Sequence, residues 1–572
     1  MRRKLIPAVF VLSCLLFLIN MNVAIAALRL PAIIGDNMVL QRNVKVPLWG
    51  WADPGEKIQI TFQKKVFECI AGNDGKWSVK LNAYRAGGPY QMVIQSSTTH
   101  LLIKNILIGD VWITSGQSNM EFGIQSEKHG AEAIAKATDT LIHFFYVPMS
   151  FSLQPQEDIG KTSGDSPNGK WVVCSPQLLG DPKWAWHGFS AIGYYFAMQM
   201  RSHEGCPVGM IATYKGGTPA QAWISIAGLK QSPAFKKYIA THDELVDHYE
   251  SANADYPHQM ATYQDALKQW TAEVGNDYEA AKKEWEIQVA QAKSSGQALP
   301  PEPKPSRPAP KAPDQPAGGF GAPSNLFNAM VAPIIPYAVK GILWYQGEGN
   351  GDKLADAVEY RDLFPRLIND WRADWNQGTI PFIFVQLANF RAPAKTPSEG
   401  NWPWVREAQL KTLSLPETGM IVITDIGQAE TIHPLNKEDA GLRLALVARQ
   451  LVYDEKIVAY GPMFKSMKIQ GNKIRLTFND VGSGLVIDSI RHSGSTELKG
   501  FGIAGDDQTF VWAKAVIDGN TIIVYSDQVP DPVAVRYNWG DNPPGNLYNT
   551  EGLPASPFRT DNWAPPLTAQ KP

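Results

Sequence analysis

The most constraining feature of the chain is an apolar run that ends in a small polar turn. Residues 106–113 read Ile-Leu-Ile-Gly-Asp-Val-Trp-Ile, a strand-like pattern that is interrupted at Gly109 and Asp110. The run leads into Ser-Gly-Gln-Ser-Asn at residues 115–119, which predicts a tight turn at the tip of a buried strand. A serine in such a turn is held on rigid backbone, as a catalytic nucleophile must be, and Ser118 is the candidate. The alternative is an ordinary strand-to-helix turn capped by Ser or Asn.

Length and composition place the chain among large globular proteins. Its 572 residues exceed a single hydrophobic core of roughly 250–300 residues, so two to four domains are expected. The formal net charge of -2, without a basic block, argues against a nucleic-acid partner. The 18 Trp and 19 Tyr residues make carbohydrate a plausible ligand, because aromatic rings stack on sugar faces, although core packing accounts for most such rings.

The N-terminus predicts a cleavable secretory signal over residues 1–26. A basic stretch at residues 2–4 precedes an apolar run at 5–19, and Ala-Ile-Ala at 24–26 is a small-x-small cleavage site. We therefore expect a secreted or periplasmic protein that has no membrane association after cleavage. The mature chain would keep an odd number of cysteines, which argues against a disulfide scaffold: Cys69, Cys174 and Cys206.

The pattern of the mature chain changes twice. Residues 27–104 contain short alternating strands between turns, which predicts a β-sandwich-like domain. Residues 105–455 alternate apolar strands with helical segments, as in a parallel α/β sheet. Residues 456–572 are β-rich again.

An insert interrupts the predicted sheet domain at residues 230–319. Apolar residues recur at spacings of three and four over residues 257–293, which predicts a long amphipathic helix. Eight prolines follow between residues 300 and 316, a segment too rich in proline for helix or sheet. We interpret the insert as a lid or spacer that packs on the sheet domain, rather than as a coiled coil that binds a partner.

Two polar stretches that follow predicted strands can stabilise an oxyanion. Gly216 and Gly217 expose backbone N–H groups, which an oxyanion hole requires. The stretch at residues 344–350 contains Gln346 and Asn350, either of which can donate a side-chain N–H. Glu348, in the same stretch, can hold the loop or contact substrate.

A third stretch offers a general base. His433 follows a predicted strand and precedes a helix, late in the sheet domain, so it can accept the proton of Ser118. Glu430 and Asp425 lie upstream, and either carboxylate can orient the second ring nitrogen of this histidine.

With these stretches together, the chain resembles the SGNH-type carbohydrate esterases, and within them the bacterial sialate O-acetylesterase-like family. The matching motifs stand at residues 109–120, 216–218, 344–348 and 432–434, and similarity extends into both flanks but not into the insert. The resemblance implies a flavodoxin-like, three-layer parallel sheet flanked by N-terminal and C-terminal β-rich segments.

The resemblance also implies roles for individual residues. Ser118 would be the nucleophile and His433 the base, with an oxyanion hole from the N–H groups of Ser118 and Gly217 and the side chain of Asn350 or Gln346. Related esterases place Asp three residues before the histidine, where this chain has Glu430. We expect Glu348 and Gln117 to contact substrate, and no metal or cofactor to take part.

The sequence therefore predicts a secreted carbohydrate O-acetylesterase that works through an acyl-enzyme on O-acetylated glycans. Sialate and the plant hemicelluloses, xylan or xyloglucan, are alternative substrates. Arg536 and Arg559 are candidates to bind a sialate carboxylate. A non-catalytic carbohydrate-binding protein and a Ser/His peptidase or lipase are alternatives of other classes. The oligomeric state stays open.

Overall fold

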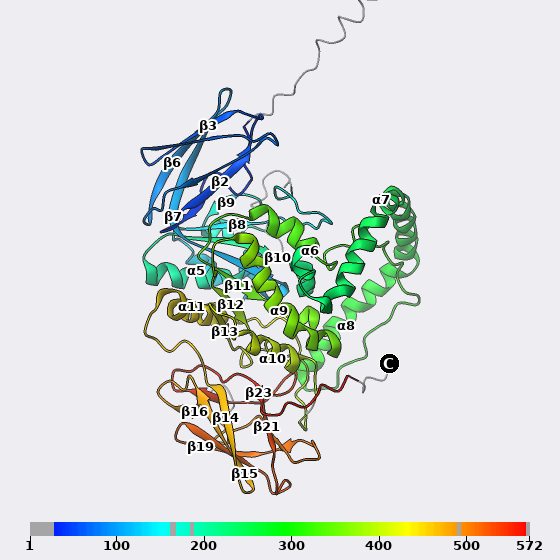
Figure 1. Ribbon diagram of the computed structural model, residues 1–572. Helices are drawn as coiled ribbons and strands as arrows, with labels where there is room; N and C mark the ends of the chain where they lie inside the picture. The colour runs from blue at the N-terminus through cyan, green and yellow to red at the C-terminus, as the bar shows by residue number, and fades with distance from the viewer. Residues whose placement is uncertain (1–27, 161–167, 184–187, 398, 489–493, 568–572) are drawn as a thin grey trace, which may run out of the picture.

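The structure is a computed structural model that describes residues 28–160, 168–183, 188–397, 399–488 and 494–567 (Figure 1). The predicted secretory signal at residues 1–26 lies outside this part of the chain. Within the described ranges, no helix combines the length and the apolar character that a membrane span needs.

A mixed β-sheet occupies the middle of the molecule and makes this an α/β fold. The strand order is β13-β12-β11-β7-β10-β8-β9, and all neighbours are parallel except β8 and β9. Most of these strands are buried along their whole length, which explains their nearly continuous apolar sequences. The strands are β7 (His100–Gly116), β8 (Ile142–Tyr146), β9 (Trp171–Val173), β10 (Val208–Tyr214), β11 (Gly341–Tyr345), β12 (Phe382–Val385) and β13 (Thr418–Ile421).

Strand β7 joins the central sheet to the N-terminal β structure. Its first half pairs with β6 (Gly87–Gln95) and β1 (Val39–Gln41), and its second half pairs with β10 and β11. Gly109 and Asp110, where the apolar pattern breaks, lie inside β7, in agreement with a strand predicted over residues 106–113. The predicted boundary between residues 104 and 105 falls inside the same strand. Buried Asp110 is tolerated because its carboxylate accepts hydrogen bonds from Arg42 at 2.9 and 2.7 Å.

Helices cover both faces of the central sheet (Figure 1). Helices α5 (Ala191–Glu204) and α11 (Glu438–Tyr453) pack together on one face, and α9 (Leu354–Trp375) and α10 (Trp402–Thr412) pack together on the other. The Ser190 hydroxyl caps α5 by accepting from the N–H of Gly193. Helix α9 buries residues at spacings of three and four, the pattern of an amphipathic helix: Tyr360, Leu363, Phe364, Leu367, Ile368 and Trp371. The shorter helices are α2 (Ser118–Glu121), α3 (Gly130–Ala135), α4 (Pro176–Leu179) and α6 (Ile226–Leu229).

Further β structure lies on either side of the central sheet and its covering helices (Figure 1). On the N-terminal side, β2 (Val46–Trp51) pairs with β5 (Lys76–Leu81), and β3 (Lys57–Phe62) pairs with β4 (Lys65–Ile70) and β6. The C-terminal segment has a hydrophobic core of its own. Its strands are β14 (Met463–Gln470), β15 (Lys473–Asn479), β16 (Leu485–Ile487), β17 (Phe501–Ala504), β18 (Val511–Trp512), β19 (Lys514–Asp518), β20 (Thr521–Tyr525), β21 (Ala534–Tyr537), β22 (Leu547–Asn549) and β23 (Phe558–Arg559).

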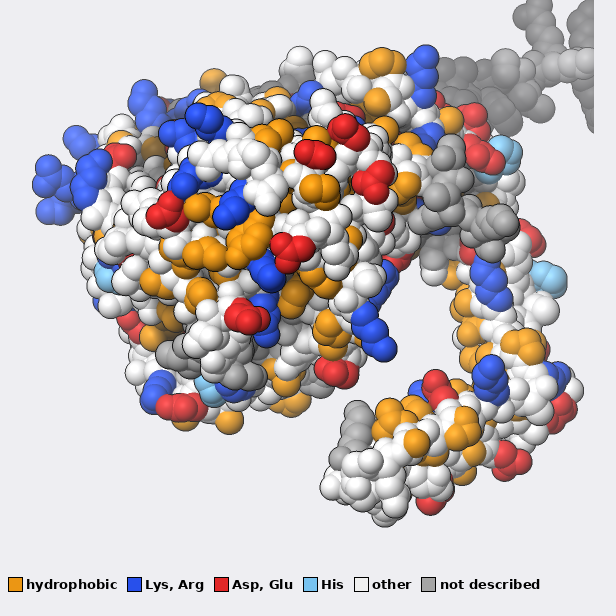
Figure 2. All heavy atoms as spheres, turned by 90° about the horizontal axis from the view of Figure 1, so that it is seen from below, with side chains coloured by type: hydrophobic (Ala, Val, Ile, Leu, Met, Phe, Trp, Pro, Cys, Tyr) orange, Lys and Arg blue, Asp and Glu red, His pale blue; other side chains and the backbone are white. Residues whose placement is uncertain are grey.

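The insert forms an arm that stands away from the rest of the molecule (Figures 1 and 2). Helix α7 (Lys236–Trp270), a π-helical turn and α8 (Asn276–Ser295) follow one another without a loop, and the proline-rich segment runs back along them. The predicted helix start at residue 257 is wrong, because Pro257 lies inside α7. The base of α7 contacts the body through Tyr238, whose hydroxyl donates to Glu359. The expectation of an insert packed on the sheet domain is therefore met only at the base of the arm.

Candidate active site

The candidate nucleophile lies where strand β7 ends, between its two neighbours β10 and β11. After β7 the chain forms β8, β9 and then β10 on one side of β7, and it later crosses to β11 on the other side, so this edge is the topological switch point of the sheet. Gly116 ends β7 with φ +131°, and a Cβ there would lie 2.1 Å from the carbonyl oxygen of Tyr345. Only glycine fits this turn. It places half-buried Ser118 at the first position of α2.

His433 approaches Ser118 from the loop between β13 and α11. Its Nε2 lies 2.9 Å from Ser118 Oγ, within hydrogen-bonding distance. Burial, together with the charge of Lys437, lowers the pKa of His433 below its usual value. The imidazole is therefore neutral at neutral pH and can accept the Ser118 proton, so the structure brings together the two residues that the sequence predicts as base and nucleophile.

Ser118 and Gly217, whose backbone N–H groups are the candidates for an oxyanion hole, line the same cavity. Gly217 follows β10 in a left-handed conformation, φ +71°, that favours glycine, and it is exposed. Among the contacts of the described residues, neither Ser118 N–H nor Gly217 N–H donates a hydrogen bond. The Gln117 side chain also lines the cavity, and its Oε1 accepts from the N–H of Gly349 at 2.9 Å, which fixes the amide group in place.

The expectation that Gln346 or Asn350 reaches the cavity is corrected. Both side chains are buried behind the wall, where they hydrogen-bond to protein groups. The Gln346 amide nitrogen donates to Asn350 Oδ1 at 2.8 Å, and the Asn350 amide nitrogen donates to Gln221 Oε1 at 3.1 Å. These residues brace the loop after β11 rather than line the cavity.

The two candidate orienting acids lie in different surroundings. Asp425 is buried and forms a two-pronged ion pair with Arg443, at 2.7 and 2.6 Å. Glu430 is exposed, and no contact between its carboxylate and His433 occurs among the described residues. The assignment of Glu430 as the third member of a triad stays a prediction.

A buried series of hydrogen-bonded polar side chains, which the sequence did not reveal, passes through Asn119, the residue after the nucleophile. Lys437 Nζ donates to Asn119 Oδ1 at 2.5 Å, and Asn119 Nδ2 donates to Glu348 Oε1 at 2.5 Å and to the carbonyl of Ile432 at 3.0 Å. Because Ile432 precedes His433, Asn119 ties the histidine loop to the turn that carries Ser118. Lys437 and Glu348, the two outer members of this hydrogen-bonded series, are side chains of opposite charge.

Burial shifts the ionisation of both outer members of this series. It lowers the pKa of Lys437 to about 7, although Glu348 and Glu127 favour its charged form. Burial also raises the pKa of Glu348, although the hydrogen bond from Asn119 favours its ionised form. No sequence pattern marked Lys437, four residues after His433 and at the start of a helix. Glu348 lines the cavity as predicted, but its Oε1 is engaged by Asn119.

The cavity over Ser118 and His433 is an open cleft of about 570 Å³. Lys215 supplies its one amino group among the described lining residues, and the carboxylate of buried Glu121 accepts the Gly216 N–H at 2.5 Å. No cluster of three or more His, Cys, Asp or Glu side chains in the described ranges is arranged to hold a metal ion. The lining residues are Gln117, Ser118, Glu121, Lys215, Gly216, Gly217, Glu348, Gly349, Asp352, Ile432 and His433.

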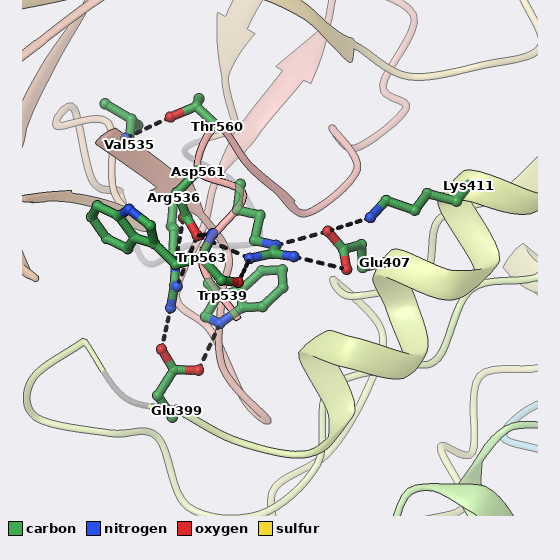
Figure 3. Close-up of polar contacts among 10 residues, drawn as sticks. Glu399, Glu407, Lys411, Val535, Arg536, Trp539, Thr560, Asp561 and Trp563 are labelled. Carbon is green, nitrogen blue, oxygen red and sulfur yellow. Dashed lines mark hydrogen bonds and ion pairs between the residues drawn. The ribbon is translucent and has the colours of Figure 1, made fainter. Parts of the chain in front are cut away.

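Arg536 and Arg559 do not line this cleft, which corrects the expectation that they bind a substrate carboxylate there. Both are nearly buried and paired with acids at the junction between α10 and the C-terminal segment (Figure 3). Arg536 pairs with Asp561 and Glu399, and Arg559 pairs with Glu407 and Asp561.

Comparisons with known proteins agree with this geometry. A solved carbohydrate acetylesterase from Xanthomonas citri is 35% identical, with a TM-score of 0.73, and the match covers 94% of this chain and 100% of that one. This chain belongs to the sialate O-acetylesterase-like carbohydrate esterases. The family model for carbohydrate esterases described as sialic acid-specific acetylesterases matches residues 320–446.

Curated mammalian enzymes give the same assignment. The sialate O-acetylesterase of Mus musculus is 26% identical over 571 residues, covering 93% of this chain and 94% of that protein. The human sialate O-acetylesterase is 25% identical over 487 residues, covering 79% of this chain and 76% of that protein. The prediction of an esterase is thereby confirmed, and a non-catalytic carbohydrate-binding protein, a peptidase and a lipase are not supported.

Proposed function

We propose that this esterase removes O-acetyl groups from sialic acids through a covalent acetyl-enzyme, with Ser118 as nucleophile and His433 as base. The observation that carries the proposal is the 2.9 Å contact between Ser118 Oγ and His433 Nε2 at the floor of an open cleft. The names of the curated relatives support sialate as the acetylated sugar.

The first half-reaction transfers the acetyl group to the enzyme. Ser118 Oγ attacks the acetyl carbonyl carbon while its proton passes to His433 Nε2. The carbonyl oxygen becomes an oxyanion, which accepts hydrogen bonds from the N–H groups of Ser118 and Gly217, with the Gln117 amide as a further donor. The C–O bond to the sugar then breaks, and the sugar oxygen takes the proton from His433.

The second half-reaction releases acetate. Water loses a proton to His433 Nε2 and attacks the acetyl carbon, and the same N–H groups hold the new oxyanion. The bond to Ser118 Oγ breaks, the serine regains its proton, and acetate leaves. Glu430, the predicted orienting acid, would bind the Nδ1 side of the imidazole in this scheme.

Lys215 is the group that can distinguish a sialate from a neutral acetylated sugar. Its amino group lies in the cleft wall, 5.0 Å from the centre of the Phe320 ring, and can reach a substrate carboxylate. We infer that Lys215, and not Arg536 or Arg559, receives the carboxylate.

The finer architecture and the location of the protein belong to the same proposal. We infer an SGNH-type hydrolase domain at residues 105–455 with the insert at 230–319, β-rich domains at 27–104 and 456–572, and export directed by residues 1–26. The parallel strands on both sides of β7 and the site at its end support the SGNH assignment.

The test is acetate release by purified mature protein from O-acetylated sialic acid and from acetylated xyloglucan or xylan, side by side. Ser118→Ala should lower kcat by about 10⁴-fold or more with an unchanged circular dichroism spectrum. Near wild-type turnover by this variant would refute the mechanism. Release from the plant glycans alone would refute sialate as the substrate.

A further inference from the structure

A second cavity lies between the C-terminal segment and the loop at residues 391–400 of the central layer. It has a volume of about 140 Å³ and is lined from the C-terminal side by residues of β17, β18 and β21 and the segments beside them. The loop contributes Pro397 and Glu399. The remaining lining residues are Gly500, Gly502, Gln508, Phe510, Trp512, Arg536 and Trp539.

The cavity presents aromatic faces whose orientation is fixed. Trp512 is 38% exposed, an unusual state for so large an apolar ring, and its indole N–H donates to the Lys395 carbonyl at 2.9 Å. The guanidinium of Arg536 lies 4.3 Å from the centre of the Phe510 ring and 5.0 Å from that of Trp539. A planar ligand can therefore stack on Trp512 without any rearrangement of the wall.

The charged groups of this cavity are already paired. Arg536 contacts Glu399 and Asp561, and Trp539 Nε1 donates to Glu399 at 3.3 Å (Figure 3). Arg391, farther along the loop, pairs with Asp541 at 2.7 Å. Arg536, the one guanidinium among the described residues that line this cavity, is paired, whereas Glu399 is 43% exposed and can still accept a hydrogen bond from a hydroxyl group.

The cavity continues toward the catalytic cleft along the same loop. A neighbouring hollow shares Glu399, Trp512 and Trp539 with it and is also lined by other described residues of this loop and by residues 540–544. At the end of this loop, Asn401 Nδ2 donates to the carbonyl of Asp352, which lines the catalytic cleft. The loop that lines the cavity is therefore hydrogen-bonded to a residue of the catalytic cleft.

We propose that this cavity is a glycan subsite that binds a neutral sugar ring of the chain whose acetyl group is removed at Ser118. The apolar C–H face of a pyranose stacks on Trp512, and its hydroxyl groups bind Glu399 and Gln508. The combination of the exposed Trp512 ring, paired charges and hydroxyl-binding side chains matches an uncharged sugar better than a peptide or an anion. The link to Ser118 rests on the proposed function, but sugar binding at Trp512 does not.

The experiment measures migration of the full mature protein in native gels that contain neutral polysaccharide: desialylated mucin, xyloglucan or xylan. We expect at least one to retard the wild-type protein, Trp512→Ala to bind about tenfold more weakly, and Trp512→Phe to retain part of the binding. Ile469→Ala, which removes another exposed apolar side chain of the C-terminal segment, is the control and should migrate as wild type. Retardation of Trp512→Ala equal to that of wild type, or none of the wild type on any gel, would overturn the subsite.

Kinetics separate this subsite from the proposed reaction. Trp512→Ala should lower the ratio of kcat/KM on an acetylated oligosaccharide to kcat/KM on an aryl acetate about tenfold, through KM. An unchanged ratio overturns the link between the subsite and catalysis. Wild-type protein that binds a neutral glycan but releases no acetate would refute the proposed function and leave the subsite standing.

Discussion

Two buried charge clusters in this esterase are built in opposite ways. In the catalytic cluster, Lys437 and Glu348 are separated by the neutral amide of Asn119. In the junction cluster, by contrast, Arg536 and Arg559 contact the carboxylates of Asp561, Glu399 and Glu407 directly.

The pKa shifts follow this difference. Burial lowers the pKa of Lys437 to about 7, and the opposite charges beyond Asn119 do not compensate. Burial also acts on Arg536 and Asp561, but their hydrogen-bonded pairing outweighs it, raising the pKa of Arg536 and lowering that of Asp561. In the catalytic cluster, the charge of Lys437 is left to act on His433. In the junction cluster, the ion pairs hold the C-terminal segment against the central layer.

The largest effect in this comparison is expected when His433, the residue on which the catalytic cluster acts, is replaced. His433→Asn should lower kcat by about 10³–10⁴-fold, because Ser118 then lacks a proton acceptor. Turnover of O-acetylated sialic acid is the measurement. Glu430→Gln, measured in parallel, should fall between wild type and His433→Asn if Glu430 orients the imidazole, and wild-type activity would remove it from the mechanism.

The junction cluster should respond in stability instead. Arg559→Met removes the buried cationic partner of Glu407, which keeps only the half-exposed Lys411, and one of the two partners of Asp561, so it should lower the free energy of unfolding by about 3 kcal/mol in urea titrations. Arg475→Met is the matched control, because the side chains of Arg475 and its partner Asp518 are 30% and 56% exposed, and it should cost about 1 kcal/mol or less. Equal losses from the two variants would contradict a structural role for the junction cluster.

The third prediction tests whether Lys437 acts on His433 through its charge. The pKa of His433 is depressed, so kcat/KM should fall as the pH drops through a value below the usual histidine pKa of about 6.5. Lys437→Met removes one of the two causes of the lowered pKa of His433. The low-pH fall of kcat/KM, the acid limb of the pH profile, should therefore move to higher pH. Activity should fall at pH 5.5 and change little at pH 8.

A double variant controls for damage to the fold. Lys437→Met with Glu348→Gln removes both charges at once, so the Glu348 carboxylate is not left behind without Lys437. The acid limb should still move to higher pH. A limb that stays at the wild-type position in both variants would contradict the electrostatic effect.

The smallest effect concerns the exposed cation of the cleft. Lys215→Met should raise KM for O-acetylated sialic acid by about fivefold, since a half-exposed ion pair contributes about 1 kcal/mol or less. KM for a neutral acetylated sugar should not change, and added salt should reduce the difference. A similar rise in KM for both substrates would show that Lys215 does not bind the substrate carboxylate.

Local sequence determined the parts of this protein that rest on short-range chemistry. The apolar run before Ser118, the glycines after β10 and the polar stretch after β11 were readable because each ends a buried strand. In parallel strands such ends meet at one edge, so the pairing of Ser118 with His433 could be expected before the structure. Residues 27–104, where alternation predicted short strands, contain β2, β3 and β5.

Only the tertiary structure decided what depends on partners distant in sequence. Asp110 is tolerated inside β7 because Arg42 pairs with it, and Pro257 lies inside α7, whereas the local pattern placed it at the start of a helix. Gln346, Asn350, Arg536 and Arg559 were plausible site residues by type, but their hydrogen bonds are satisfied away from the cleft. Lys437 became visible only through its contact with Asn119, 318 residues away in the chain. Residue type and spacing predict which groups can do chemistry, whereas burial and the available partners select those that do.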